Sequence, residues 1–205
     1  MQTYKVIAFD CDGVLFDTAA SNRAYYNTIL NQLDMPDMTE EQFCYVHMHT
    51  VQDALAYLFN KNQALQKAKS IKEALSYAPF VAAYKMEPAL IPLLKKLRPA
   101  YKTAIATNRS DSMPTLLREH DITSYFDLIV SANDVPRPKP HPDQLLRLLE
   151  HFEASPREML YVGDSKVDES AAKAARVPLV AYDNESLSAQ YHIRSLEEIK
   201  DILGL

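Results

Sequence analysis

The segment VIAFDCDG (residues 6–13) places four apolar residues directly before two aspartates that share a short loop. A short, continuous apolar run is typical of a strand buried on both faces, as in a parallel sheet. Similar runs follow at residues 103–106, 128–130, 159–162 and 179–181. Helical patterns lie between and after them, at residues 88–97, 112–120, 142–151, 169–175 and 196–203. Strands that alternate with helices predict an α/β fold with a doubly wound parallel sheet.

One interval departs from this alternation. Between about Ala19 and Ala83 no convincing strand pattern occurs, and the apolar residues recur at helical spacing. A crossover between parallel strands normally needs one helix, whereas this interval is long enough for about four. We therefore expect a small all-helical domain at residues 18–83, inserted after the first strand. The core domain would then consist of residues 1–17 and 84–205.

The composition narrows the class of protein. The chain has 205 residues, of which 47% are hydrophobic and 24% charged, and this excludes a disordered or fibrous protein. A formal charge of −5 argues against non-specific binding to nucleic acid, which needs a basic surface. No segment reaches the ~20 apolar residues of a membrane span, and no basic-then-apolar leader opens the chain. Cys11 and Cys44 are too few for a disulfide framework, so we expect a protein of the reducing cytoplasm.

Glycine is unusually rare. The chain has three glycines, where average usage would give roughly 14. Two of them, Gly13 and Gly163, directly flank Asp12 and Asp164, and Gly204 lies near the end of the chain. We expect the first two to permit a sharp turn or a close approach of the backbone at a functional site.

Polar residues follow the apolar runs where the strands are expected to end. They are Asp10 and Asp12 after the first run, Thr107, Asn108 and Arg109 after the second, Lys139 in the proline-rich loop after the third, and Asp164 and Asp168 after the fourth. In open α/β sheets, ligands bind beyond the carboxyl ends of the strands. Four carboxylates, a hydroxyl and a lysine are therefore expected at one edge of the sheet.

These residue types favour phosphoryl transfer. Carboxylates crowd together only around a cation, and a set of hard oxygen ligands favours Mg²⁺. A metal ion with Lys139 and Thr107 would supply the positive charge and the donor that a phosphoryl group needs. Asp10 can then act as nucleophile and Asp12 as general acid and base.

Four motifs carry a resemblance to a known family. The first, DCDGVLFDT (residues 10–18), resembles motif one of the haloacid dehalogenase-like (HAD) superfamily. The others, in the family's order, are ATNR (106–109), RPKPHPD (137–143) and GDSKVD (163–168). The subgroup that the chain resembles is the phosphoglycolate phosphatase and β-phosphoglucomutase-like one. Its members have a Rossmann-like core and a helical cap domain inserted just after the first motif.

The resemblance implies a role for each matching aspartate. Asp10 would attack phosphorus and form an aspartyl-phosphate, and Asp12 would protonate the leaving oxygen and then activate water. The Mg²⁺ ligands would be the Asp10 carboxylate, the Asp12 backbone carbonyl and Asp164. Asp168 would complete the metal site by orienting Lys139 or a metal-bound water. The dehalogenases of the superfamily lack the second aspartate, so Asp12 favours a phosphate ester as substrate.

The remaining motif residues would bind the phosphoryl group. Thr107 would bind it through its hydroxyl, Asn108 through its backbone N–H, and Lys139 would neutralise its charge. The predicted activity is therefore a Mg²⁺-dependent phosphatase that acts on a small phosphorylated metabolite. Phosphoglycolate, a sugar phosphate and a nucleotide are all compatible substrates, and the sequence does not indicate an oligomeric state.

Two other functions stay open. A sugar-phosphate mutase would share the core, although TNR (107–109) resembles the phosphatase version of the second motif. A catalytically silent binding or regulatory module would be expected to lack Asp10, Asp12 or Lys139, and the chain has all three. Each aspartate could also simply cap a helix or a turn, as aspartates often do.

The helical insert is expected to select the substrate. The segment YVHMHT (45–50) is predicted to connect two of its helices, and His47 stands where similar caps often have glycine. His47 and His49 could bind an anionic or hydroxylated leaving group, or they could be ordinary loop residues. Arg23 is a second candidate if the first helix of the insert faces the site.

Three further residues have less specific roles. Arg109 could contact the substrate or form a surface salt bridge. His141 stands between two prolines and is expected to be structural, and Cys11 is expected to be a passive buried thiol.

Overall fold

A computed structural model describes residues 4–60, 62–98 and 100–205, so residues 1–3 of the predicted core lie outside the described part. Its centre is a six-stranded sheet in the order β5-β4-β1-β6-β7-β8, and all neighbouring strands are parallel. The strands are β1 (Val6–Phe9), β4 (Lys102–Ala106), β5 (Leu128–Val130), β6 (Met159–Gly163), β7 (Leu179–Tyr182) and β8 (Tyr191–Ile193). The predicted α/β class with a parallel sheet is therefore confirmed.

The central strand β1 is buried on both faces, as its apolar run predicts. Its side chains alternate between two separate cores. Ile7 and Phe9 belong to one hydrophobic cluster, and Val6 and Ala8 belong to the other. All five predicted strands are present. The edge strand β8 was not predicted, because its sequence YHI contains a histidine and lacks a continuous apolar run.

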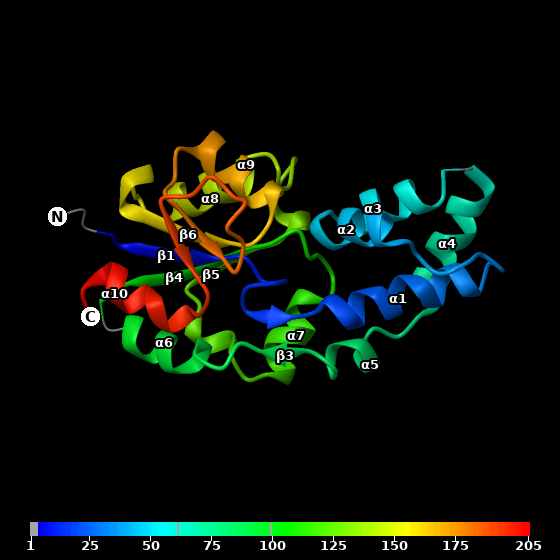
Figure 1. Cartoon of the computed structure of the whole chain (residues 1–205), viewed down its shortest axis with the longest axis horizontal. Coiled ribbons are helices and arrows are strands. Elements are labelled where there is room, and N and C mark those ends of the chain that lie inside the picture. The colour runs from blue at the N-terminus through cyan, green and yellow to red at the C-terminus, as the bar shows by residue number, and fades with distance from the viewer. Residues whose placement is uncertain (1–3, 61, 99) are drawn as a thin grey trace.

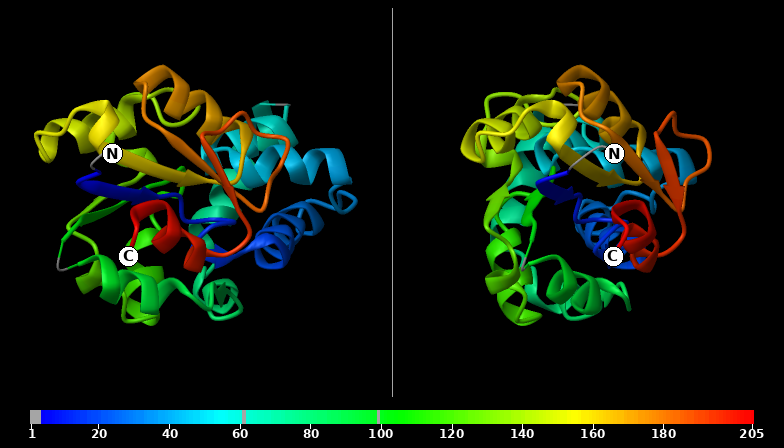
Figure 2. Two further views of the ribbon diagram at one scale, coloured as in Figure 1. Left: turned by 60° about the vertical axis from the view of Figure 1, so that its left-hand side comes forward. Right: turned by 90° about the vertical axis from the view of Figure 1, so that its left-hand side faces the viewer.

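Helices cover both faces of the sheet (Figures 1 and 2). The helices α6 (Leu90–Leu97), α7 (Met113–Glu119) and α10 (Ile199–Leu203) pack on the face of Ile7 and Phe9. The helices α8 (Asp143–His151) and α9 (Lys166–Ala175) pack on the opposite face. Short 3-10 turns lie at Thr123–Tyr125, Ala132–Asp134, Pro156–Glu158 and Leu196–Glu198.

Two predicted helices begin three residues away from the observed start of the α-helix, and the other predicted starts in the core differ by one or two residues. The helix predicted from residue 169 begins at Lys166, because Ser165 and Asp168 form a capping box that starts the helix one turn earlier. The helix predicted over 196–203 begins as a 3-10 turn and becomes α-helical only at Ile199.

The interval after β1 is helical, as predicted, and forms a separate body on the right in Figure 1. It contains α1 (Ala19–Asn31), α2 (Glu40–Met48), α3 (Val51–Leu58), α4 (Asn62–Ala74) and the single turn α5 (Ala78–Val81). These helices enclose a third hydrophobic cluster that includes Ile29, Leu55 and Phe59. The domain boundaries at 17/18 and 83/84 stay a prediction.

A two-stranded antiparallel ladder stands where the chain enters and leaves this helical body. The strands β2 (Phe16–Asp17) and β3 (Lys85–Met86) pair Phe16 with Met86 and Asp17 with Lys85. Neither strand was predicted, because two residues are too few to show a periodic pattern.

Within the described ranges, none of the helices combines the length and the apolar character needed to cross a bilayer.

Candidate active site

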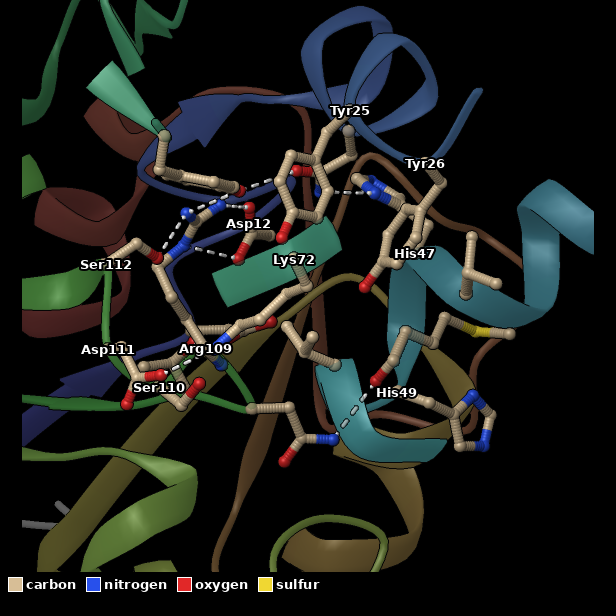
Figure 3. Close-up of a pocket in the computed structure, with 18 of the residues that line it drawn as sticks. Asp12, Tyr25, Tyr26, His47, His49, Lys72, Arg109, Ser110, Asp111 and Ser112 are labelled. Atoms are coloured by element: carbon tan, nitrogen blue, oxygen red, sulfur yellow. Dashed lines mark hydrogen bonds and ion pairs between the residues drawn. The ribbon is translucent and has the colours of Figure 1, made fainter. Parts of the chain in front are cut away.

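The carboxyl ends of β1, β4 and β6 meet beside the helical body and enclose a cavity of about 420 Å³ (Figure 3). Its wall on the sheet side contains the residues predicted from the strand ends: Asp10, Asp12, Thr107, Asn108, Arg109, Lys139 and Asp164. Its opposite wall comes from α1, α2 and α4 and from the segment before α5. The topology therefore brings together residues that are up to about 150 positions apart in the chain, as the rule for open α/β sheets predicts.

Lys139 is the buried cation at the base of this site. Its Nζ lies 2.8 Å from Asp10 Oδ1 and 2.7 Å from Asp168 Oδ1, and it donates to the backbone carbonyl of Ala106 at 3.0 Å. Burial alone would lower the pKa of Lys139, but the two carboxylates outweigh it and raise that pKa. Lys139 is therefore charged at neutral pH and lies against the Asp10 carboxylate.

Asp168 has all its acceptor positions occupied. Its Oδ1 accepts from Lys139 and from the Tyr161 hydroxyl at 2.7 Å. Its Oδ2 accepts from the backbone N–H of Ser165 at 3.1 Å and from the Ser165 hydroxyl. Asp168 thus caps α9 and orients Lys139 with the same carboxylate.

Three carboxylates converge at this end of the sheet, and two of them, Asp10 and Asp164, are available to hold a cation. One oxygen from each of Asp10, Asp164 and Asp168 lies within 4.8 Å of the others. Burial, followed by the neighbouring carboxylates, raises the pKa of Asp164 well above its usual range. Burial likewise raises the pKa of Asp10 to about 7, against the pull of Lys139.

A divalent cation fits this arrangement. Asp10 Oδ1 has its ion pair with Lys139 but no hydrogen bond from any described residue, so it has lone pairs to offer. The raised pKa values of Asp10 and Asp164 reflect charge repulsion and burial that a cation would relieve. The ligand atoms are hard oxygens, as Mg²⁺ prefers.

Both active-site glycines stand where a side chain would collide with this acidic group. A Cβ on Gly13 would lie 2.1 Å from Asp164 Oδ2, and the φ of Gly13 is +81°. A Cβ on Gly163 would lie 2.5 Å from the Cβ of Asp168. The expected close approach of the backbone is therefore present at both positions.

Asp12 lies beside this group but has different partners. Arg109 binds its carboxylate with two nitrogens, Nε to Oδ2 at 3.1 Å and Nη2 to Oδ1, as the dashed lines of Figure 3 mark. The Thr18 hydroxyl donates to Asp12 Oδ1 at 2.6 Å. Burial raises the pKa of Asp12, but Arg109 and Thr18 together lower it below its usual value. Asp12 is therefore ionised in the free protein.

Arg109 itself is buried, with a relative exposure of 6%. Of the two alternatives left open for Arg109, the surface salt bridge is wrong, because its ion pair with Asp12 lies inside the cavity wall. The guanidinium also donates to the hydroxyls of Tyr84 at 3.0 Å, Ser112 at 3.0 Å and Tyr77 at 3.2 Å. Arg109 thus connects the sheet side of the cavity to the segment that follows α4.

The two residues after β4 are both buried at the cavity. The Thr107 hydroxyl accepts from the backbone N–H of Arg109 at 3.1 Å and keeps its own hydrogen for another acceptor. The Asn108 side chain donates to the carbonyls of Lys139 at 2.8 Å and Met48 at 3.1 Å. Its Oδ1 is buried without a hydrogen-bond partner among the described residues.

The two histidines of the insert differ in their surroundings. The predicted connection over residues 45–50 is mostly helical, since α2 continues to Met48 and only two residues separate it from α3. His47 Nδ1 lies 3.1 Å from Asn22 Nδ2 inside the cavity, and burial lowers the pKa of His47. His49 stacks on Tyr45 with ring centroids 4.0 Å apart, and its imidazole points away from Asp12 in Figure 3.

Three other predicted residues lie elsewhere. Arg23 forms an ion pair with Glu40 at 2.7 Å and does not line the cavity, so α1 does not bring it to the site. His141 is exposed outside the cavity wall. Cys11 is fully buried, and burial raises the pKa of its thiol well above the usual range, which agrees with a passive role.

Sequence reasoning missed several residues that hold the site together. Tyr161 supports Lys139 and Asp168 from within β6, and Thr18 supports Asp12. Tyr77 and Tyr84 bind Arg109. A hydroxyl in the otherwise apolar run 159–162 was a usable signal for Tyr161, but nothing in the sequence pairs the two tyrosines with Arg109.

Known proteins resemble this chain in sequence and in structure. Residues 7–182 match the family model described as haloacid dehalogenase-like hydrolase. A phosphoglycolate phosphatase of Nitrosospira multiformis is 29% identical over 188 residues, which cover 83% of this chain and 79% of that protein. The crystal structure of a HAD-superfamily hydrolase of subfamily IA from Geobacter sulfurreducens is 38% identical with a TM-score of 0.80, covering 98% of this chain and 97% of that one. A β-phosphoglucomutase from Clostridium difficile, at 18% identity and a TM-score of 0.83 over 98% of both chains, shares the fold. The motif residues, their geometry and these matches agree: the chain belongs to the haloacid dehalogenase-like hydrolase family.

Proposed function

We propose that this enzyme is a Mg²⁺-dependent phosphatase that hydrolyses a small phosphomonoester through an aspartyl-phosphate on Asp10. The phosphatase relatives and the family support the reaction class. One observation carries the proposal: Asp10, Asp164 and Asp168 converge within 4.8 Å at a cavity that Lys139 and Asp12 also line. This set contains a nucleophile, a cation site, a buried positive charge and a second carboxylate for proton transfer.

The first step transfers the phosphoryl group to the protein. An Asp10 oxygen attacks phosphorus, the bond from phosphorus to the ester oxygen breaks, and a proton from Asp12 goes to that oxygen. Asp12 is ionised in the free protein, so it must first take up a proton. The negative charge of an arriving phosphate raises the pKa of a neighbouring carboxyl group and opposes the effect of Arg109.

The second step releases phosphate. Asp12, now ionised again, accepts a proton from a water molecule as that water attacks the aspartyl-phosphate. The bond between phosphorus and the Asp10 oxygen breaks, and inorganic phosphate leaves. The roles proposed for Thr107 and Lys139 in both steps are donation to the phosphoryl oxygens and neutralisation of their charge.

Mg²⁺ would be held by Asp10, Asp164 and the backbone carbonyl of Asp12, and it would supply positive charge to the phosphoryl oxygens. Asp168 would act by fixing Lys139, because its own oxygens already accept four hydrogen bonds. We also propose that residues 18–83 act as a cap domain that closes over the substrate and limits the access of water.

The test compares Asp10→Asn with wild type on a panel of phosphomonoesters, with Mg²⁺ and with a chelator, by measuring phosphate release. We expect turnover that needs Mg²⁺ and that falls roughly 10³-fold or more in the variant. Asp37→Asn is the matched control, because Asp37 is exposed in the insert and far from the cavity lining. Isomerised sugar phosphate with little free phosphate would instead identify a mutase, and no turnover on a broad panel would identify a silent binding module.

A further inference from the structure

The cavity has an aromatic wall that phosphoryl transfer does not use. Tyr25 and Tyr26 of α1 line it, with relative exposures of 3% and 5%, and His47 lies beside them (Figure 3). Figure 3 shows Tyr25 and Tyr26 on the same side as His47, and Arg109 and Asp111 on the other side. This wall and Asp10 line the same cavity, so a phosphate ester bound at Asp10 would share the cavity with these side chains.

The two tyrosine hydroxyls have no hydrogen-bond partner in the part of the chain that the structure describes. Their rings pack edge to face, with centroids 5.2 Å apart, and Tyr25 packs in the same way on Tyr77. Among the described residues, none forms a hydrogen bond with the hydroxyl of Tyr25 or of Tyr26. Although both residues are buried, neither hydroxyl oxygen is closed off from solvent, so both open onto the cavity, where a ligand can supply the hydrogen-bond partner.

His47 adds a third neutral donor. The Asn22 amide nitrogen 3.1 Å from His47 Nδ1 can only donate, and the Asn22 oxygen accepts from the Tyr77 hydroxyl. Nδ1 is therefore the acceptor, and Nε2 carries the hydrogen. Because burial lowers the pKa of His47, the ring is uncharged at neutral pH.

The lysines and arginine of the cavity wall are already paired. Arg109 binds Asp12, Lys139 binds Asp10 and Asp168, and Lys72 of α4 lies 2.9 Å from Asp111. Of the described residues that line the cavity, no lysine or arginine lacks a carboxylate partner. A leaving group with its own negative charge would therefore face Asp12 and Asp111 without a free cation to balance it.

The cavity, which also has to hold the phosphoryl group, has room for more than a two-carbon leaving group. A volume of about 420 Å³ gives room for roughly 14 groups of the size of water. It lies within the usual range for small-molecule sites.

We propose that the leaving group is an uncharged, hydroxyl-bearing molecule of sugar or nucleoside size, bound by Tyr25, Tyr26 and His47. A substrate that carries a carboxylate on the leaving group, such as phosphoglycolate, is then a poor one, although a similar protein is a phosphoglycolate phosphatase. This inference rests on the proposed phosphatase function and adds the substrate class.

The first experiment compares esters that differ only in the charge of the leaving group. Hydroxyethyl phosphate is paired with phosphoglycolate, and sorbitol 6-phosphate with 6-phosphogluconate; each pair exchanges a hydroxymethyl group for a carboxylate. With wild type and Mg²⁺, we expect kcat/KM at least tenfold higher for the neutral member of each pair. Ribose 5-phosphate and uridine 5′-monophosphate are then compared to decide between a sugar and a nucleoside.

The second experiment removes the two hydroxyls. In Tyr25→Phe and Tyr26→Phe, the loss of one hydrogen bond should lower kcat/KM on the preferred neutral substrate by about three- to tenfold, mainly through KM. Hydroxyethyl phosphate, whose leaving group has a single hydroxyl, should show less than a twofold change. Tyr57→Phe is the matched control, because Tyr57 is 40% exposed on α3.

Two results would contradict the proposed substrate class while leaving the proposed phosphatase activity intact. Phosphoglycolate or 6-phosphogluconate hydrolysed faster than its neutral partner would show that the cavity does bind a second anion. Unchanged KM in both tyrosine variants would show that the hydroxyls do not contact the substrate. Failure of the phosphatase proposal looks different, because then no ester of the panel releases phosphate and Asp10→Asn equals wild type.

Discussion

Replacing Gly163 by alanine tests whether the close packing at the end of β6 is essential. The new Cβ would lie 2.5 Å from the Cβ of Asp168 and 2.6 Å from its Cγ, both closer than side-chain atoms approach in proteins. The Cβ of Asp168 is attached directly to the backbone of α9, so a change of side-chain rotamer cannot relieve the overlap. Either β6 or α9 has to move, and overpacking of this kind costs about 1–3 kcal/mol.

The displacement also disturbs the buried ion pair. Asp168 holds Lys139 at 2.7 Å, and breaking a buried pair costs about 3–5 kcal/mol. Since movement weakens the pair without removing it, we expect Gly163→Ala to lower the free energy of unfolding by roughly 3 kcal/mol. The free energy of unfolding of most domains is only about 5–15 kcal/mol, so a loss of this size is large. Activity should fall as well, because Lys139 loses its fixed position beside Asp10.

The assay is urea unfolding followed by circular dichroism, with phosphate release measured under native conditions. Gly204→Ala is the control: its φ is +69°, but no atom lies within 4 Å of its new Cβ. It should lose only about 1 kcal/mol, from backbone strain, and keep full activity. A Gly163→Ala variant as stable and as active as the Gly204→Ala control would refute the reasoning.

Three further predictions concern other parts of the molecule. Arg109→Ala should lower the free energy of unfolding by roughly 3 kcal/mol at pH 8 and by clearly less at pH 5.5. In wild type the pKa of Asp12 is lowered from 3.8, so the ion pair with Arg109 is intact at both pH values and is lost only in stronger acid. In the variant, the buried Asp12 has no cation beside it and takes up a proton as the pH falls. The unpaired buried charge then disappears, so the loss of stability is smaller at pH 5.5. Equal losses at the two pH values in urea unfolding would contradict this. Leu97→Ala in α6 should cost about 2–5 kcal/mol in the same assay, whereas Leu146→Ala, which is 46% exposed on α8, should stay within about 0.5 kcal/mol. Arg176→Gly should raise the midpoint of thermal unfolding by a few degrees. Arg176 ends α9 at a φ of +59°, and glycine at this position relieves roughly 1 kcal/mol of backbone strain. A lowered midpoint would contradict this prediction.

The parts of the fold that the sequence predicts are those with a strong local pattern. The strand of residues 6–9 and its four counterparts were recognisable because burial on both faces requires continuous apolar runs. The polar residues that follow them were placed at one site because parallel strands end at the same edge. The strands β2, β3 and β8 escaped prediction, since each has only two or three residues and depends on its partner.

The parts that could not be predicted depend on contacts between distant residues. Asp12 and Arg109 are 97 positions apart, and no local signal indicates that the arginine binds that carboxylate and not the substrate or solvent. The orientation of α1 likewise decides that Tyr25 and Tyr26 face the cavity while Arg23 pairs with Glu40. Such orientations follow from the packing of the third hydrophobic cluster as a whole.

The short ladder between β2 and β3 has a consequence for how such enzymes diversify. Asp17 and Lys85 stand opposite each other in adjacent antiparallel strands, so the chain leaves the sheet domain and returns to it at points only about 5 Å apart. The 67 residues between them therefore amount, topologically, to one long loop. Its length and sequence can change without altering the register of the six parallel strands. Recombination at these two points would exchange the whole helical insert and leave the six parallel strands and the polar residues at their ends in place.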